Sequence, residues 1–221
     1  MSDRSYEQLR TSFTAAVSHE LRTPLARILA LLESAALPGA DVQALVARAR
    51  DEAERAGELI DDILFLAELD GGDAAAQEPV RALPVLRSVA AGLDGAAARA
   101  GVRIVVEGDE DAELPLGDRL LRVVVENLAT NAIHHAGHGS TLTLSARAGE
   151  LVAADDGVGV GPEHLPRLFE RFYRADSARS SPGSGLGLAI VKHAVAAAGG
   201  TVEAESRRGA GVAIRCTFTT S

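Results

Sequence analysis

The strongest constraint on the fold is a long apolar repeat that covers the first third of the chain and then stops. Apolar residues recur every three or four positions, the spacing of an amphipathic helix, at Leu9, Phe13, Ala16, Val17, Leu21, Ile28, Leu31 and Leu32. A Pro38-Gly39 pair interrupts this run, and Asp41, a good helix N-cap, opens a second run that ends at Leu69. The spacing therefore predicts two helices within residues 5–69, joined by a short turn as a helical hairpin.

Such a hairpin cannot enclose a core of its own. A helix of about 30 residues is about 45 Å long, and each of two such helices has a single neighbour. Stable bundles of this kind usually contain four helices. We therefore expect two chains to pair through the hairpin as a homodimer with a four-helix bundle. The alternative is that the hairpin packs on the second half of its own chain.

The pattern of the sequence changes after residue 70. Residues 71–78 are mostly Gly, Asp and Ala and predict a linker between a domain at 1–70 and a domain at 79–221. In the second domain we expect helices at 83–100, 118–135, 162–169 and 187–198, and strands at 102–107, 141–146, 151–155, 201–205 and 212–219. The expected fold class is α + α/β, a helical hairpin followed by an α/β sandwich.

Composition and motif tests exclude several functions. The formal net charge of -9 argues against a nucleic-acid binder, and the single cysteine, Cys216, rules out an intramolecular disulfide or a cysteine zinc cluster. No apolar run approaches the roughly 18 residues of a membrane span, and the start of the chain is polar. We therefore expect a cytoplasmic chain without membrane contact of its own. The sole lysine, Lys192, lies outside any P-loop pattern, and Thr23 stands where a zincin needs its second histidine.

His19 differs from its neighbours in the direction that it faces. At roughly 100° per residue it lies about 200° from Val17 and Leu21, so it points away from the apolar stripe. Glu20 is next to it, and Pro24 removes a helical hydrogen bond one turn further on. A nearby carboxylate can hold one imidazole nitrogen protonated and leave the other free to attack. The alternative is an ordinary surface histidine.

Two segments of the second domain carry polar residues suited to a nucleotide. Asn127 and Asn131, one turn apart on one helix face, can hold Mg²⁺ and its waters. Asp155 ends an apolar strand before Gly157 and Gly159, so its carboxylate can accept a hydrogen bond from the amino group of adenine while the glycines admit the ring. Taken singly, these features are also explained as two surface asparagines and a hairpin turn.

Two further segments are rich in aromatic residues and in glycine. Residues 168–174 form the aromatic-rich stretch of an aromatic-poor chain. Gly183, Gly185 and Gly187 lead into an apolar helix, whose free N–H groups can bind phosphate. The small polar residues at 175–182, between these two segments, predict a mobile lid.

Together these residues resemble the transmitter core of bacterial sensor histidine kinases. Residues 18–25 resemble the H box of this family, 127–135 the N box, 155–159 the G1 box, 169–174 the F box and 183–188 the G2 box, in the order that the family has. The resemblance implies a HisKA-type dimerisation and phosphoacceptor domain, followed by an ATP-binding α/β sandwich of the Bergerat (GHKL) type.

The resemblance also implies an activity and its residues. His19 would receive the γ-phosphoryl group of ATP, and Glu20 would orient or deprotonate His19. An aspartate of a response-regulator receiver domain would then take the phosphoryl group. Thr23 matches the phosphatase pattern of the family and would orient a hydrolytic water, and Asn131 would bind Mg²⁺. The implied nucleotide contacts are Asn127, Asn131, His134, His135, Asp155, Gly157, Gly159, Tyr173, Arg174, Gly183, Gly185, Leu186, Gly187 and Leu188.

Two positions depart from the patterns of related proteins. His134 stands where the family usually has lysine or arginine, and a neutral imidazole is a poorer phosphate partner than a permanent cation. Asn127 stands where GHKL ATPases have the glutamate that activates water, which implies little free ATP hydrolysis.

Two rival functions stay open at this point. One is a dimeric scaffold that binds nucleotide without transferring phosphate, and the other is a GHKL serine kinase, which leaves the H box unexplained. Family members commonly carry a sensor upstream of this core. The chain would then be either the cytosolic part of a membrane-bound kinase or a soluble kinase that receives its signal from a partner.

Overall fold

The computed structural model of the chain describes residues 3–70, 78–175 and 183–219, with side chains from residue 17 onward. It divides into two compact units, one ending at Leu64 and the other beginning at Phe65. The boundary falls within a helix, so the last turns of that helix belong to the second unit. Each unit is described by itself below.

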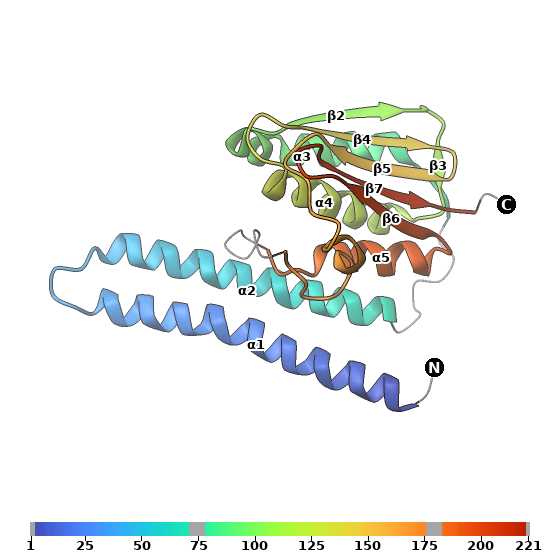
Figure 1. The fold of residues 1–221 in the computed structure, drawn as a ribbon. Coiled ribbons are helices and arrows are strands. Elements are labelled where there is room, and N and C mark those ends of the chain that lie inside the picture. The colour runs from blue at the N-terminus through green and yellow to red at the C-terminus, as the bar shows by residue number, and fades with distance from the viewer. Residues whose placement is uncertain (1–2, 71–77, 176–182, 220–221) are drawn as a thin grey trace. The chain divides into compact units, whose positions relative to one another are not determined.

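The first unit is a helical hairpin (Figure 1). Helix α1 spans Asp3–Ala35 and helix α2 spans Val42–Asp70, which confirms the two predicted helices and the break between them. Asp41 caps α2, because its Oδ1 accepts a hydrogen bond from the Ala44 N–H at 3.1 Å. Pro24 lies inside α1 without ending it.

Few apolar side chains of the hairpin are buried among those that the structure describes, from residue 17 onward. Ala49, Ala56 and Leu59 of α2 are buried in this unit, whereas Leu25 and Leu29 of α1 are 59% and 58% exposed. The exposure of large apolar side chains to water is unfavourable, and packing against a partner surface removes this exposure. The described residues of the hairpin therefore leave apolar surface uncovered, as expected for two helices that each have one neighbour.

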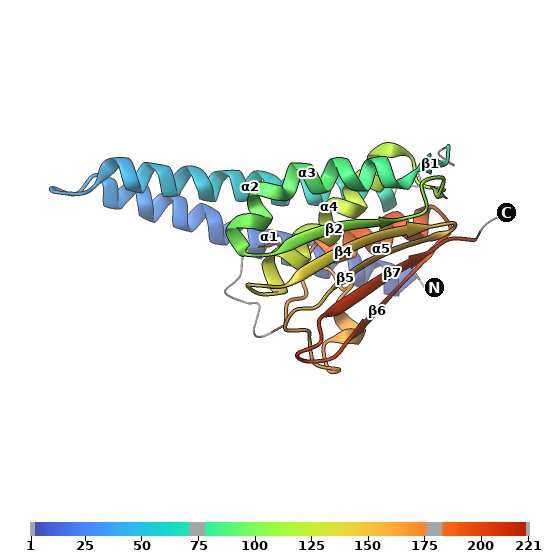
Figure 2. The ribbon, with the colours of Figure 1, turned by 90° about the horizontal axis from the view of Figure 1, so that it is seen from above.

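The second unit contains a five-stranded sheet with the order β2-β4-β5-β7-β6 (Figure 2). The strands span Arg103–Gly108 (β2), Thr141–Arg147 (β4), Glu150–Asp155 (β5), Thr201–Ser206 (β6) and Val212–Thr217 (β7). Strands β2 and β4 are parallel, and the other neighbours are antiparallel. All five strands lie where the sequence predicted them, within a few residues at their ends.

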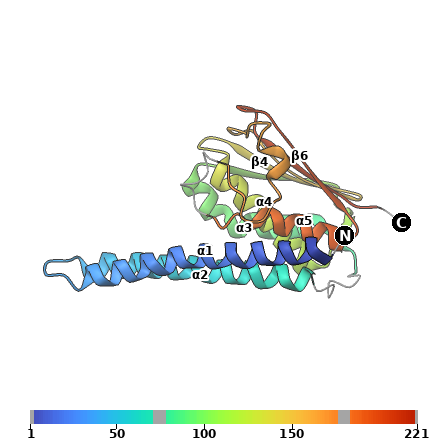
Figure 3. The ribbon, with the colours of Figure 1, turned by 60° about the horizontal axis from the view of Figure 1, so that its bottom comes forward.

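Three helices cover one face of this sheet (Figure 3). They are α3 (Ala82–Ala100), α4 (Asp118–His135) and α5 (Gly187–Ala197). Alternate residues of β4, namely Leu142, Leu144 and Ala146, point into the core between sheet and helices. Cys216 of β7 is buried in the same core, as the sequence predicted. One layer of helices on one sheet is the predicted α/β sandwich.

The structure differs from the sequence prediction in two places. Residues 162–169, predicted as a helix, contain one short 3₁₀ helix, η1 (Leu165–Arg167). Pro166 has no N–H to donate, so an α-helix that began at Pro162 would lack its first internal hydrogen bond. The structure also contains a two-stranded pair, β1 (Val80–Arg81) and β3 (Glu113–Leu114), which was not predicted. Residues 176–182 of the predicted lid and 71–77 of the predicted linker lie outside the described residues.

Candidate functional site

The first unit presents the residues of the predicted phosphoacceptor site. His19 and Thr23 are exposed on α1, and Glu20 is half-buried. Thr23 Oγ1 donates a hydrogen bond to the His19 carbonyl oxygen at 3.4 Å, so the hydroxyl lies one turn from the imidazole. The exposure of His19 agrees with the direction that the helical spacing predicted, and it leaves the ring accessible for chemistry.

In the second unit, the predicted asparagines lie where α4 meets the start of α5. Asn127 Nδ2 donates to the Val123 carbonyl at 2.9 Å, and a Cβ added at Gly187 would lie only 2.6 Å from Asn127 Oδ1. The glycine therefore allows the first turn of α5 to approach the N-box helix. Asn131 is half-buried one turn further along α4. The N box and the G2 box, about 60 residues apart in sequence, thus share one region of the fold.

Two histidines complete the C-terminal end of α4. The His134 and His135 ring centroids are 6.2 Å apart, with His134 exposed and His135 half-buried. Burial lowers the pKa of His135, and the positive charges of His134 and Arg174 lower it further. The charge of Arg174 in the F box therefore acts on a histidine of the N box. These effects favour the neutral form of the His135 ring over the charged form.

The shifted His135 gives a pH dependence of folding stability. Its pKa is lower in the folded chain than in the unfolded chain, where it is about 6.5. The unfolded chain therefore takes up a proton first as the pH falls, and stability declines from about pH 7 downward. We expect the urea midpoint to fall more between pH 7.5 and pH 5.5 in the unchanged chain than in His135→Gln. Equal losses in the two proteins would contradict this assignment.

The predicted adenine loop follows β5 and is packed against the end of α4. Asp155 Oδ1 accepts a hydrogen bond from the Gly157 N–H at 2.9 Å, and the Val158 N–H donates to the Ala136 carbonyl at 2.9 Å. A Cβ at Gly157 would lie 2.1 Å from that carbonyl oxygen, which explains the glycine. Burial raises the pKa of Asp155, and hydrogen bonds from the Gly157 and Val212 N–H groups oppose this rise.

The end of β6 and the turn that follows it, which lie outside the predicted motifs, support the same loop. Ser206, at the end of β6, accepts a hydrogen bond from the Val160 N–H at 2.8 Å and donates to the Gly211 carbonyl at 2.6 Å. Gly159 has φ 62°, and a Cβ there would lie 2.2 Å from the Arg207 carbonyl oxygen. The end of β6 and the turn between β6 and β7 thus pack against the G1 loop and support it. Nothing in the spacing of the motifs indicated Ser206.

The F and G2 segments are joined by backbone and side-chain hydrogen bonds. The Phe172 N–H donates to the Gly185 carbonyl at 3.0 Å, and Arg174 Nη1 donates to the Gly183 carbonyl at 3.1 Å. The structure therefore places Arg174 beside the glycine-rich loop. The Leu186 side chain is fully buried and leaves its backbone for any ligand contact, and the half-buried Leu188 packs against the core cluster.

The hydroxyl of Tyr173 is directed to a protein partner. It lies 2.7 Å from His164 Nδ1, and the Arg167 guanidinium lies over the Tyr173 ring at 4.2 Å from its centroid. Because the Tyr173 side chain contacts both His164 and Arg167, it fixes the loop that follows η1. Within this structure, Tyr173 is thus a support of the F-box loop, and a direct nucleotide contact by its hydroxyl stays a prediction.

Among the described residues, no three His, Cys, Asp or Glu side chains are grouped in a way that could hold a metal ion. In the same described ranges, no helix is both long enough and apolar enough to cross a membrane.

Comparison with known proteins agrees with this arrangement. The family model of the His Kinase A (phospho-acceptor) domain matches residues 9–72. The model of the histidine kinase-, DNA gyrase B- and HSP90-like ATPases matches residues 117–221. Fold and motifs thus define a protein with a phospho-acceptor hairpin and an ATPase-type sandwich.

Individual relatives narrow this class to one family. The phosphate regulon sensor protein PhoR of Pseudomonas aeruginosa is 37% identical over 96% of this chain and 50% of its own. The solved structure of the mycobacterial sensor histidine kinase MprB is 30% identical, with a TM-score of 0.55 over 64% of this chain and 97% of its own. Full-length ShkA, solved in complex with AMPPNP, is 31% identical, with a TM-score of 0.62 over 97% of this chain and 47% of its own.

This chain belongs to the sensor histidine kinases. It spans about half the length of the curated relatives that it matches.

Proposed function

We propose that this chain is an ATP-dependent protein histidine autokinase of a two-component system. The observation that carries the proposal is the exposed His19 beside Glu20 on a phospho-acceptor hairpin. The accompanying unit brings the N, G1, F and G2 segments together around the ends of α4 and α5. ATP is the proposed phosphoryl donor, as the complex of the related ShkA with AMPPNP supports.

The nucleotide would be held at both ends by the second unit. Asp155 would accept a hydrogen bond from the adenine amino group, while Gly157 and Gly159 keep the backbone close to the ring. The phosphates would meet the N–H groups at the start of α5, where a helix favours anions. The proposed phosphate-side contacts are Asn127, Asn131, His134, His135, Tyr173, Arg174, Gly183, Gly185, Leu186, Gly187 and Leu188.

The proposed reaction is an in-line displacement at the γ-phosphorus. The free imidazole nitrogen of His19 forms the N–P bond as the bond to the ADP oxygen breaks, and Glu20 takes the proton from the other ring nitrogen. Arg174 would offset negative charge on the phosphate oxygens. Mg²⁺, held by Asn131, would supply further charge neutralisation. With Asn127 in place of a water-activating glutamate, free hydrolysis of ATP should be slow.

The partners follow from the uncovered surface of the hairpin. The exposed Leu25 and Leu29 support a homodimer in which the helices of a second copy complete a four-helix bundle. The receiver domain of a response regulator would dock on the solvent face, where Ala26, Arg27 and Leu31 are the candidate contacts, and would take the phosphoryl group on an aspartate.

The chemical stability of the phosphorylated product tests this function. Incubation of the purified chain with ATP labelled in its γ-phosphate should give protein-bound label that survives alkali and is lost in acid, as expected of a phosphorylated imidazole. Acid-stable label would favour a serine kinase. Nucleotide binding without label would favour a scaffold.

Thr23 gives a separate prediction, which concerns the dephosphorylation of the response regulator. If its hydroxyl orients a water for dephosphorylation of the regulator, Thr23→Ala should lower phosphatase activity about tenfold or more and leave autophosphorylation within about twofold. Ser34→Ala is a matched control, because Ser34 Oγ makes the same contact with the carbonyl four residues back, at 2.7 Å. Equal loss of both activities in Thr23→Ala would refute the separate role.

A further inference from the structure

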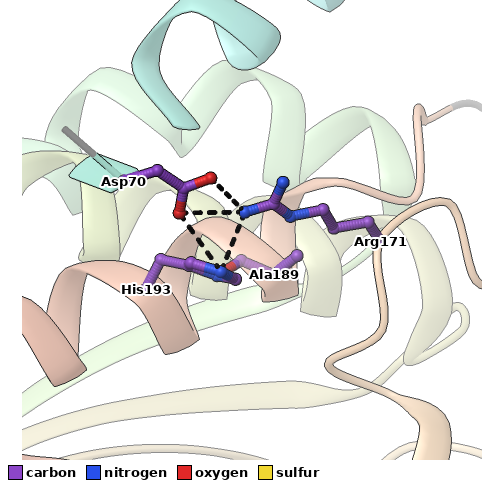
Figure 4. Close-up of polar contacts among 4 residues, drawn as sticks. All are labelled: Asp70, Arg171, Ala189 and His193. Carbon is purple, nitrogen blue, oxygen red and sulfur yellow. Dashed lines mark hydrogen bonds and ion pairs between the residues drawn. The ribbon is translucent and has the colours of Figure 1, made fainter. Parts of the chain in front are cut away.

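The end of α2 is joined to the F-box loop by a cluster of three polar side chains (Figure 4). Arg171 Nη2 lies 2.7 Å and 3.0 Å from the two carboxylate oxygens of Asp70, the last residue of α2. The same Nη2 lies 2.9 Å from Nε2 of His193 on α5, and His193 Nδ1 lies 2.8 Å from the Ala189 carbonyl oxygen. Since Nδ1–H donates to that carbonyl, Nε2 is free to accept from Arg171.

The cluster is half-buried, and all of it belongs to the second compact unit. The side-chain exposures are 25% for Arg171, 31% for His193 and 47% for Asp70. An ion pair that is partly shielded from water and shares a second hydrogen bond holds its geometry better than a fully exposed pair. Asp70 therefore fixes Arg171, and with it the start of the F-box turn.

Arg171 is linked to the glycine-rich loop through the residues that follow it in the chain and their hydrogen bonds. The next residue, Phe172, has φ 62°, a left-handed conformation that is uncommon for a residue with a bulky side chain. Its N–H donates to the Gly185 carbonyl, and Arg174, two residues on, donates to the Gly183 carbonyl. A strained residue persists only where its surroundings hold it on both sides. Here Arg171 is held on one side by Asp70, and the glycine-rich loop lies on the other.

A second ion pair at the end of α2 does not lead to this loop. Glu68 Oε2 lies 3.1 Å from Arg119 Nη2, and the same guanidinium lies 5.5 Å from the Phe65 ring centroid. Arg119 belongs to the first turn of α4, at the opposite end of that helix from Asn131 and His135. The end of α2 thus offers two ion pairs of the same kind, of which one reaches the F box.

We propose that Asp70 is a positioning residue for the nucleotide phosphates, acting through Arg171 and the strained Phe172 on the glycine-rich loop. The inference rests on the proposed binding of ATP and adds a route by which the end of α2 sets the affinity for its phosphates. Without the Asp70 charge, the Arg171 guanidinium loses this ion pair at the end of α2, and the hydrogen bond from the Phe172 N–H to the Gly185 carbonyl is held less firmly. The loop then presents its N–H groups less well to phosphate, while the adenine loop is unaffected.

The test compares ATP with adenosine on the full chain. Both are titrated as competitors of a fluorescent ATP analogue, with Mg²⁺ present, against Asp70→Asn, Arg171→Gln, the double variant and the matched control Glu68→Gln. We expect each single variant at the Asp70 pair to weaken ATP about three- to tenfold, within the range of side-chain coupling, and to leave adenosine unchanged. The double variant should bind ATP no more weakly than the single variant with the lower ATP affinity. Glu68→Gln should bind ATP as tightly as the unchanged chain does.

Several outcomes would overturn the inference. If Asp70→Asn and Glu68→Gln bind ATP equally well, Asp70 does not act on the glycine-rich loop. If Asp70→Asn weakens the binding of ATP and of adenosine equally, Asp70 has a general structural role instead. If Arg171→Gln does not fold, Asp70→Asn and the charge-conserving Asp70→Glu carry the test, with Asp70→Glu expected to bind ATP more tightly than Asp70→Asn. An unchanged chain that binds neither ATP nor adenosine would instead refute the proposed function itself.

Discussion

Replacing His19 by glutamine should reduce the incorporation of γ-phosphate to background, a loss of about a hundredfold or more. Glutamine is similar in size and polarity but has no nitrogen lone pair that can attack phosphorus. Nucleotide affinity should stay within about twofold, because the proposed nucleotide contacts all belong to the second compact unit and His19 belongs to the first. The measurement is acid-labile label per chain, alongside the dissociation constant for ATP and the midpoint of thermal unfolding.

A second exposed histidine provides the control for this prediction. His138 lies in the turn after α4 and is exposed like His19, so His138→Gln makes the same chemical change away from the hairpin. The His138→Gln variant should incorporate as much acid-labile label as the unchanged chain does. Label that persists in His19→Gln would show that another residue accepts the phosphoryl group, and acid-stable label there would favour the serine kinase alternative.

Much of the fold could be predicted because its elements are long and regular. Helix α4 was predicted at 118–135 and spans Asp118–His135, since its apolar positions keep the helical period from end to end. Strand β4 was equally clear, because apolar residues alternate with Thr and Ser along it. Strands β1 and β3 could not be predicted, because two residues are too few to show an alternation.

The candidate site was predictable in its residue types and not in its contacts. Asp155, Asn131 and the glycines were found because a carboxylate, carboxamides and glycines at short spacing suit a nucleotide, and the resemblance gave them roles. The partners of these groups come from distant parts of the chain. Asp70 and Arg171 are 101 residues apart, and no local spacing predicts which charges meet after folding. Ser206 was missed for the same reason.

The G1 loop gives the second prediction with a large effect. At Gly157, an added Cβ would lie 2.1 Å, 2.5 Å and 2.6 Å from the O, Cα and C atoms of Ala136. These are backbone atoms at the end of α4, so no change of rotamer relieves the clash, and the loop itself must move. That movement breaks the hydrogen bond from the Val158 N–H to the Ala136 carbonyl and turns the Asp155 carboxylate away from its place. Overpacking of this kind costs about 1–3 kcal/mol.

Gly157→Ala should therefore weaken nucleotide binding about ten- to a hundredfold, if the full cost appears in the loop that receives adenine. Adenosine and ATP should weaken by the same factor, because the base loop is shared by both ligands, in contrast to the phosphate-selective effect expected at Asp70. Gly92→Ala is the matched control: a Cβ there meets no atom within 4 Å, and alanine favours the helix in which it lies. Competition titration of the two variants, with their thermal midpoints, decides the matter. Unchanged adenosine affinity in Gly157→Ala would mean that adenine does not bind at the end of β5, and the role proposed for Asp155 would then have to be abandoned.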